Sequence, residues 1–267
     1  MKTVKILLLA ALVISFGFSC KKITESTSDS ALQNPAYSAD LLAASSIMTV
    51  ESITNELEAI VKQVRQDSVV SGYLSCANVV RTNINNEQKI EISFNAAAVC
   101  TDQTSRSGKL TVTIQNSSGN IFVASNGYKV NDVTVSGNYS FQPVTENQKS
   151  LMKLVVPDGQ LSVSSGNYIK FNLLRKTYVK EGGASASVTD DVIETLESSY
   201  DLQIKDSGSV LLVDAEGVVP YAVRYGCTDP YRPRSGKIKF QRSNSEIRYL
   251  LLGNGNCSDK ATISDAL

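Results

Sequence analysis

The sequence predicts a mainly β protein, built as an antiparallel meander sheet or sandwich with one N-terminal amphipathic α-helix. Three observations lead to this fold class. From about residue 70 onward, apolar and polar residues alternate with a period of two, as in half-buried strands. Ser-Gly, Asn-Gly, Asp-Gly and Glu-Gly pairs separate these segments and suit tight hairpin turns. Before residue 70 the apolar spacing is that of a helix.

The first 20 residues, MKTVKILLLAALVISFGFSC, have the layout of a signal peptide. Lys2 and Lys5 form a positive n-region, and Ile6–Phe18 contains no charge. A membrane-spanning helix needs roughly 18 or more apolar residues, so this shorter run predicts a leader that is cleaved. We expect residues 1–19 to be removed and Cys20 to carry diacylglycerol and an acyl chain. An ordinary secretory leader with an unmodified cysteine is the alternative.

The segment after Cys20 predicts a flexible connection followed by a helix. Residues 20–46 are rich in Ser, Thr and Ala and read as a lipidated tether. Residues 47–67 show helical apolar spacing, with Thr49 as the expected N-cap. We expect this helix to pack on a single β-rich domain at 47–267; a helix lying on a membrane surface is the alternative.

The remaining segments of the domain are short and alternate in polarity. The strand-like segments are KIEISF, KLTVTIQ, NIFVAS, NDVTVSGNYSFQP, SLMKLVVPDGQLSVSSGNYIKFNLL, GSVLLVDAEGVVPYAVRY, GKIKFQ, EIRYLLLG and KATIS. The exception is VTDDVIETLES, for which we predict one short helix capped by Thr189 or Asp190.

Composition excludes several classes of function. The chain has no histidine, so a Ser-His-Asp or Cys-His nucleophile, an imidazole zinc site and a histidine base are all excluded. Basic and acidic residues number 26 each, which gives no electrostatic footprint for nucleic acid. We therefore expect neither a nucleic-acid partner nor a cofactor.

Five cysteines divide into Cys20 and four others. Cys76, Cys100, Cys227 and Cys257 allow three disulfide connectivities in an oxidising compartment. We favour Cys76 with Cys100 and Cys227 with Cys257, because each pair is close in sequence and brackets a predicted strand pair. A metal bound by four thiolates is the alternative, although no CxxC spacing is present.

Two of the cysteines begin an internal repeat. CTDQTSRSGKLTVTI from Cys100 resembles CTDPYRPRSGKIKFQ from Cys227, and a truncated third copy begins at Cys257. The Arg-Ser-Gly-Lys steps predict turns, since a phosphate loop needs G-x-x-x-x-G-K-[ST] before a helix. Asp102, Asp229 and Asp259 follow the cysteines and predict Asx turns, with calcium binding as the alternative.

At these loops the chain resembles a family of uncharacterised Bacteroidota outer-membrane lipoproteins. The residues that carry the likeness are the two Arg-Ser-Gly-Lys loops and the close GNGNCSDKA at 253–261. Cys20 followed by two lysines also resembles the relaxed lipidation site of that group. The resemblance implies lipid anchoring at the outer membrane, and it carries no activity or catalytic residue over to this chain.

One tyrosine- and arginine-rich segment, PYAVRYGCTDPYRPR, is a candidate binding surface. Tyr and Arg are common among the residues that dominate interface energies. The candidate residues are Tyr221, Arg224, Tyr225, Tyr231, Arg232 and Arg234. Packing of the tyrosines in the core is the alternative interpretation.

These observations predict a lipid-anchored cell-envelope protein with a non-catalytic binding or structural role. The expected partners are the membrane, through the anchor, and a protein or glycan ligand that the sequence does not identify. We expect the outer membrane as location and favour its periplasmic face. A carrier of a hydrophobic ligand between the sheet and the helix is one alternative. A glycan hydrolase that uses two carboxylates is another.

Overall fold

The computed structural model describes residues 35–66, 74–95, 100–163, 166–185 and 187–265. Within them one helix, α1 (Pro35–Gln66), precedes 13 strands. The strands are β1 (Ala77–Ile84), β2 (Glu87–Phe94), β3 (Arg106–Gln115), β4 (Ile121–Val130), β5 (Val133–Ser136), β6 (Asn138–Glu146), β7 (Lys149–Ser162), β8 (Tyr168–Glu181), β9 (Val192–Asp206), β10 (Ser209–Arg224), β11 (Pro233–Arg242), β12 (Ile247–Asn254) and β13 (Thr262–Ser264).

All 13 strands belong to one antiparallel sheet whose spatial order follows the chain. The order is interrupted only around β6, which pairs with both β4 and β7 while β5 also pairs with β7. The predicted mainly β meander with one N-terminal helix is confirmed, and it takes the form of a single sheet rather than a sandwich.

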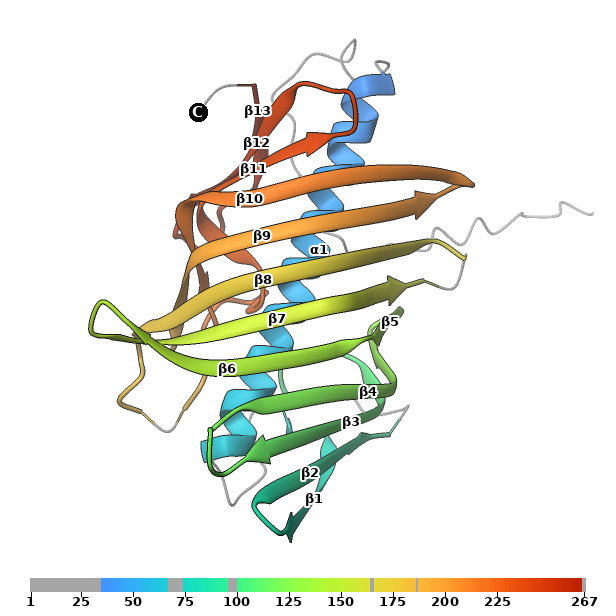
Figure 1. Cartoon of the computed structure of the whole chain (residues 1–267). Coiled ribbons are helices and arrows are strands. Elements are labelled where there is room, and N and C mark those ends of the chain that lie inside the picture. Colours follow the sequence, from blue (N-terminus) through green and yellow to red (C-terminus); the bar gives the residue numbers. More distant parts are fainter. Residues whose placement is uncertain (1–34, 67–73, 96–99, 164–165, 186, 266–267) are drawn as a thin grey trace, which may run out of the picture.

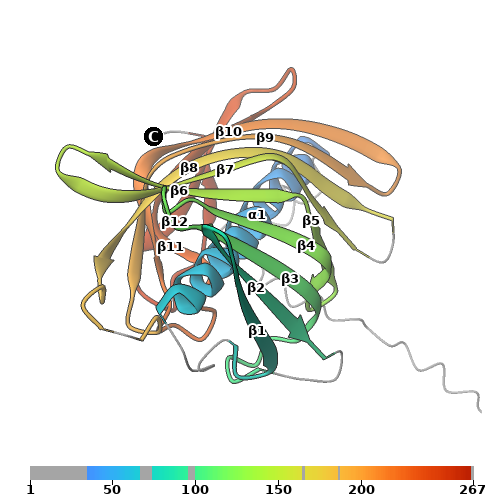
Figure 2. The ribbon, with the colours of Figure 1, turned by 60° about the horizontal axis from the view of Figure 1, so that its bottom comes forward.

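The sheet curves strongly and α1 lies along its concave side. Figure 1 shows α1 crossing the strands from β12 down to β3. After rotation, β1–β4 and β11–β12 lie on opposite sides of the helix (Figure 2). Inward side chains of the strands, such as Ile90, Ile92 and Phe240, pack with Ile47 and Leu57 of the helix in one hydrophobic core. The helix therefore occupies the centre of the molecule.

Helix α1 is longer than predicted at its N-terminal end. It begins at Pro35, so residues 35–46 are helical and the prediction that they belong to a tether was wrong. Proline suits the first turn of a helix, and Ala43 and Ala44 are fully buried against the sheet. Thr49 is not a cap, since its hydroxyl donates to the Ser45 carbonyl at 2.9 Å inside the helix. The small residues that made this segment look like a tether in the sequence instead allow the helix to pack closely against the sheet.

The short helix predicted around residues 188–198 is absent, because β9 occupies most of this segment. Val192, Ile193 and Thr195 are β-branched, and they pair with β8 on one side and β10 on the other. Thr189 and Asp190 lie in the preceding turn and cap no helix. Backbone hydrogen bonds to β8 and β10 therefore make this stretch a strand, although the spacing of its apolar residues is that of a helix.

The surroundings of α1 are protein on nearly all sides. Most of its side chains from Asp40 to Val64 are buried. The alternative of a helix lying on a membrane surface is therefore wrong. In the part of the chain that the structure describes, no helix is both long and apolar enough to span a membrane.

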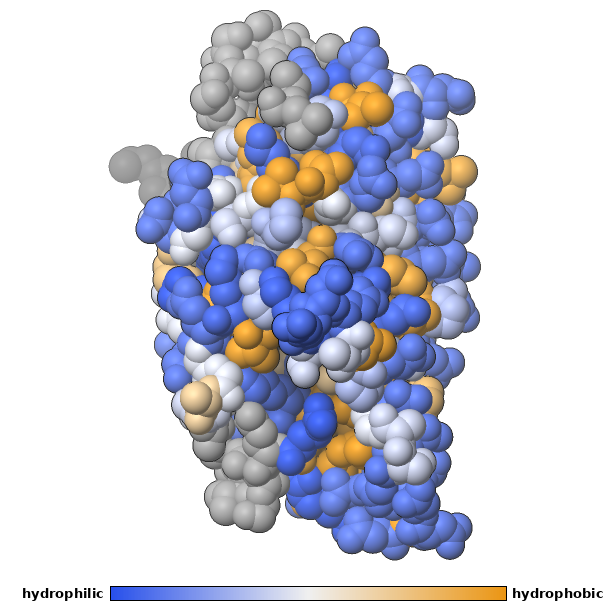
Figure 3. Space-filling model, turned by 60° about the vertical axis from the view of Figure 1, so that its left-hand side comes forward, coloured by the Kyte–Doolittle hydropathy of each residue, from blue (hydrophilic) through white to orange (hydrophobic). Residues whose placement is uncertain are grey.

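The outside of the molecule is more hydrophilic than the surroundings of α1. Figure 3 shows one side of the molecule, where hydrophilic side chains surround separate groups of apolar ones. On the outer face of the sheet a groove of about 340 Å³ lies over β3, β4, β6 and β7, lined by apolar residues such as Phe122 and Pro157 and by polar ones such as Asn138 and Gln142. None of its lining residues carries a charge.

Candidate functional site

Polar residues gather in the middle of α1, inside the molecule. Glu51, Thr54, Asn55 and Glu56 are at most 2% exposed, and Glu58 is half-buried. The apolar stripe of this helix packs on one part of the curved sheet, so its polar stripe faces another part instead of solvent. Burying carboxylates in this way is unfavourable unless each finds a charged or hydrogen-bonding partner.

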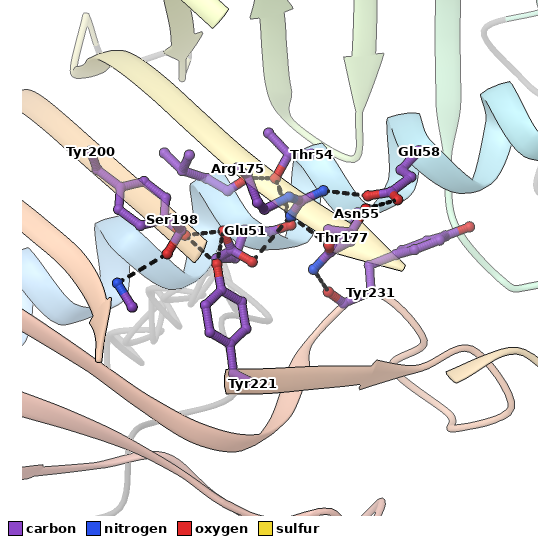
Figure 4. Close-up of polar contacts among 12 residues, drawn as sticks. Glu51, Thr54, Asn55, Glu58, Arg175, Thr177, Ser198, Tyr200, Tyr221 and Tyr231 are labelled. Carbon is purple, nitrogen blue, oxygen red and sulfur yellow. Dashed lines mark hydrogen bonds and ion pairs between the residues drawn. The ribbon is translucent and has the colours of Figure 1, made fainter. Parts of the chain in front are cut away.

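The central partner is Arg175, an inward-facing residue of β8 that is fully buried. Its Nη1 donates to Asn55 Oδ1 at 2.7 Å, to Thr54 Oγ1 at 3.1 Å and to Glu51 Oε2 at 3.2 Å. Its Nη2 donates to Glu58 Oε2 at 2.6 Å. Figure 4 shows the guanidinium group between these side chains of one helix face.

Two tyrosines close the other side of Glu51. Tyr200 from β9 and Tyr221 from β10 both donate to Glu51 Oε1, the latter at 2.9 Å, and their hydroxyl groups also contact each other (Figure 4). Burial, reinforced by the charge of Glu51, raises the pKa of Tyr200 and of Tyr221 well above the usual phenol value. Both phenols are therefore neutral hydrogen-bond donors to a carboxylate.

A second cluster surrounds Arg106, which is also fully buried. Its Nε donates to Glu56 Oε1 at 2.8 Å, and its two terminal nitrogens donate to the two Asp102 oxygens at 2.9 and 2.6 Å. Tyr128 donates to the same Glu56 oxygen at 2.5 Å, and Tyr231 donates to Asp102 Oδ2 at 3.0 Å. This cluster links α1, the start of β3 and the loop before β11.

The ionisation of the second cluster follows from this pairing. Burial alone would raise the pKa of Asp102, but the hydrogen bonds and charge of Arg106 outweigh burial and lower it. Burial opposes the charged form of Arg106, yet the charge of Glu56 and the hydrogen bonds with Asp102 outweigh that effect and raise its pKa. Asp102 and Arg106 therefore stabilise each other's charged forms.

Further ion pairs hold the two ends of α1. At its start, Asp40 accepts from Arg242 Nε at 2.5 Å and from Arg248 Nε at 3.2 Å. Near its end, Lys62 forms an ion pair with Asp191, the residue after the predicted cap Asp190. Burial raises the pKa of Asp191 even though Lys62 opposes that rise. The helix is thus fixed to the sheet by charged contacts along its whole length.

The predicted binding surface has to be corrected. Five of its six residues are at most 6% exposed, namely Tyr221, Tyr225, Tyr231, Arg232 and Arg234. Only Arg224 is exposed, 3.6 Å from Glu181. Strand alternation turns Tyr221 of β10 inward, and Tyr225 and Tyr231, which follow the strand, donate to Asn55 and Asp102, so these tyrosines lie in the interior and offer no docking surface.

Both favoured disulfides are confirmed. Cys76 is bonded to Cys100 with Cα atoms 4.9 Å apart, and Cys227 to Cys257 with Cα atoms 5.3 Å apart. The connectivity excludes the alternative of a four-thiolate metal site. Cys20 lies outside the described residues, so its lipidation stays a prediction.

The repeated Arg-Ser-Gly-Lys steps lie in strands and not in turns. Gly108 and Gly236 have φ of 82° and 93° and sit at register shifts of the β3–β4 and β10–β11 pairs. These are β-bulges, in which glycine accepts the left-handed backbone. Both glycines have the positive φ expected of a turn residue. In this protein that conformation bends a strand and directs the preceding arginine side chain toward the interior.

The three aspartates of the repeat also differ from one another. Asp102 makes the predicted Asx turn, since its Oδ1 accepts from the Thr104 amide at 3.1 Å. Asp229 lies 3.9 Å from Arg234. Asp259 Oδ2 instead accepts from upstream backbone amides, which lowers its pKa. Within the described residues no three His, Cys, Asp or Glu side chains gather in an arrangement suited to a metal ion.

Sequence reasoning missed Arg175, Thr177 and Tyr200, which complete the central cluster. The available signal was strand alternation: Phe171, Leu173 and Arg175 occupy every second position of β8, which places a charge on the core-facing side. A charge in an apolar row implies a buried partner. The partner itself lies more than 100 positions away and has no sequence mark.

No family model matches the chain, and neither a curated protein nor a solved structure matches it. The likeness to Bacteroidota lipoproteins therefore depends on the leader and the loop motifs alone.

Proposed function

We propose that this chain is a lipoprotein of the bacterial outer membrane, anchored through Cys20, whose folded body has a non-catalytic binding or structural role. The observation that carries the proposal is the use of the cysteines. Four of the five form two disulfides, which persist in an oxidising compartment, and Cys20 is left directly after the leader.

The interior supports a structural role for the buried polar residues. Glu51, Glu56 and Glu58 each bind an arginine or a phenol across the helix–sheet contact. A glycosidase needs two carboxyl groups facing a substrate bond, and Glu51 and Glu58 instead share Arg175. The hydrolase alternative gains no support from this arrangement.

The carrier alternative is also weakened. A hydrophobic ligand between the sheet and the helix would need the space on the concave side. Side chains of α1 occupy that space, and Ile47, Leu57 and Ile60 are at most 1% exposed. A protein or glycan partner on the outer surface remains the proposed binding mode.

Metabolic labelling with palmitate tests the anchor. Wild-type protein is expected to incorporate the label and to fractionate with membranes, whereas a Cys20→Ala variant incorporates none. A Cys257→Ala variant is the matched control, because it also removes one cysteine and should keep the label. Equal labelling of wild type and Cys20→Ala contradicts the proposal.

Protease treatment of intact cells tests the side of the membrane. On the periplasmic face, which we favour, the body is protected until the outer membrane is permeabilised. Release of the body from intact cells would place it on the cell surface.

A further inference from the structure

Exposed apolar side chains lie at the end of the molecule where α1 begins. Val210 and Leu212, at the start of β10, are 53% and 52% exposed, and Ile247, at the start of β12, is 41% exposed. Single exposed apolar residues are ordinary on a protein surface. These three residues are of interest because they lie near the first turns of α1 and near a tyrosine that is flanked by lysines.

A short chain of contacts connects them to the first turns of α1. The Ser243 amide donates to the Leu212 carbonyl at 3.2 Å. The neighbouring Arg242 donates to Asp40 at 2.5 Å and to the Ala36 carbonyl at 3.3 Å. These contacts connect Leu212, through Ser243 and Arg242, to the first turns of α1.

An aromatic residue flanked by lysines adjoins the same place. The strand register aligns Tyr168 of β8 with Lys205 of β9 and then with Val210 of β10. The amino groups of Lys170 and Lys205 lie 5.2 and 5.8 Å from the centroid of the Tyr168 ring. Tyrosine and lysine side chains suit the boundary of a bilayer, where the apolar part enters the acyl region and the polar tip stays among headgroups.

We infer that this surface rests on the membrane to which Cys20 is attached. We name it the docking patch, and it consists of Tyr168, Lys170, Lys205, Val210, Leu212 and Ile247. The inference rests on the proposed lipid anchor. Fourteen residues, the number from 21 to 34, reach at most about 50 Å when fully extended, so an anchor at Cys20 keeps this end within that distance of the bilayer.

The charges around the docking patch define the kind of contact. Asp206 follows Lys205 at the end of β9, Asp214 lies two residues after Leu212 in β10, and Glu246 precedes Ile247. The patch is therefore not a basic surface that would need anionic lipid. Insertion of the apolar side chains is the interaction that its chemistry allows, and phosphatidylcholine vesicles are a sufficient probe.

The absence of tryptophan from the chain allows a direct test. A Leu212→Trp variant of the full, lipidated protein is bound to phosphatidylcholine vesicles with and without brominated acyl chains, which quench tryptophan at the bilayer. The matched control is Phe122→Trp, since Phe122 is 41% exposed on the outer face. The strand register places it five strands from β10, about 24 Å away.

Docking predicts that the tryptophan of Leu212→Trp is blue-shifted and quenched several-fold more than that of Phe122→Trp. Adding Val210→Glu to Leu212→Trp is expected to reduce the quenching to the control value. Equal quenching of both variants while they float with the vesicles overturns the docking patch and leaves the anchor intact. Failure of both to float, together with absence of palmitate, overturns the anchor and the inference with it.

Discussion

Arg175 shows how one side chain organises the interior of this protein. A fully buried guanidinium contacts two carboxylates, an amide and a hydroxyl of α1. Such a network adds little net stability over an apolar core, because desolvation offsets most of the attraction. The hydrogen bonds of this network nevertheless form in only one arrangement of the helix. We therefore interpret the network as fixing the rotation of α1 and its position along the sheet.

Replacing Arg175 by methionine is therefore expected to lower the free energy of unfolding by about 3 to 5 kcal/mol, because the buried Glu51 and the half-buried Glu58 lose their cation. Urea denaturation followed by circular dichroism measures the change. Lys176→Met is the matched control: Lys176 is the next residue of the strand, its ion pairs lie near the surface, and little change is expected. A small effect at both positions would contradict the role of Arg175.

At the scale of elements, the repeated loops use glycine to place an arginine inside the molecule. A Cβ atom on Gly108 would lie 2.1 Å from the Gly127 carbonyl oxygen, and one on Gly236 would lie 2.4 Å from the Pro220 carbonyl oxygen. Both glycines also have positive φ, which side chains disfavour. The two bulges thus depend on glycine for conformation and for space.

The Gly108→Ala variant should lose about 3 kcal/mol or more of stability, because backbone strain and a clash with main-chain atoms add together. Gly127→Ala is the matched control, since Gly127 has φ of 62° but no atom within 4 Å of its Cβ position. We expect that control to lose only about 1 kcal/mol. Thermal unfolding of the two variants measures the difference, and equal losses would argue against the close approach.

Across the whole molecule, the curved sheet and the loop before β11 bury six tyrosines, namely Tyr128, Tyr139, Tyr200, Tyr221, Tyr225 and Tyr231. Burial is the main cause that raises the pKa of four of them, Tyr128, Tyr139, Tyr200 and Tyr221. A raised folded-state pKa means that the folded form keeps its phenol protons while the unfolded form loses them above about pH 10. The stability linked to these groups is complete below that pH and is lost as the pH rises.

Unfolding at alkaline pH tests whether the buried phenols make the stability depend on pH in this way. The melting temperature should fall steeply above about pH 10, as unfolded phenols ionise. Tyr139→Phe should make the fall shallower, because burial is the cause of the raised pKa of Tyr139 and its hydroxyl makes one weak bond to the Ser136 carbonyl at 3.3 Å. An unchanged pH dependence in that variant would show that Tyr139 ionises freely in the folded protein.

The local pattern of the chain was sufficient for the fold class, the β-meander and both disulfides. Period-two alternation and hairpin residues act between neighbours in sequence, and each disulfide closes a loop of 24 or 30 residues. These features depend on short-range physics, so they can be read without a structure.

The role of α1 required the folded structure. Its apolar face resembles that of any surface helix, and only the curvature of a 13-stranded sheet places its polar face against Arg106 and Arg175. The same curvature turned Tyr221 and Tyr231 from a predicted surface into interior donors. Side chains separated by more than 50 positions meet only after the sheet has curved around the helix, and no local pattern encodes which of them will be partners.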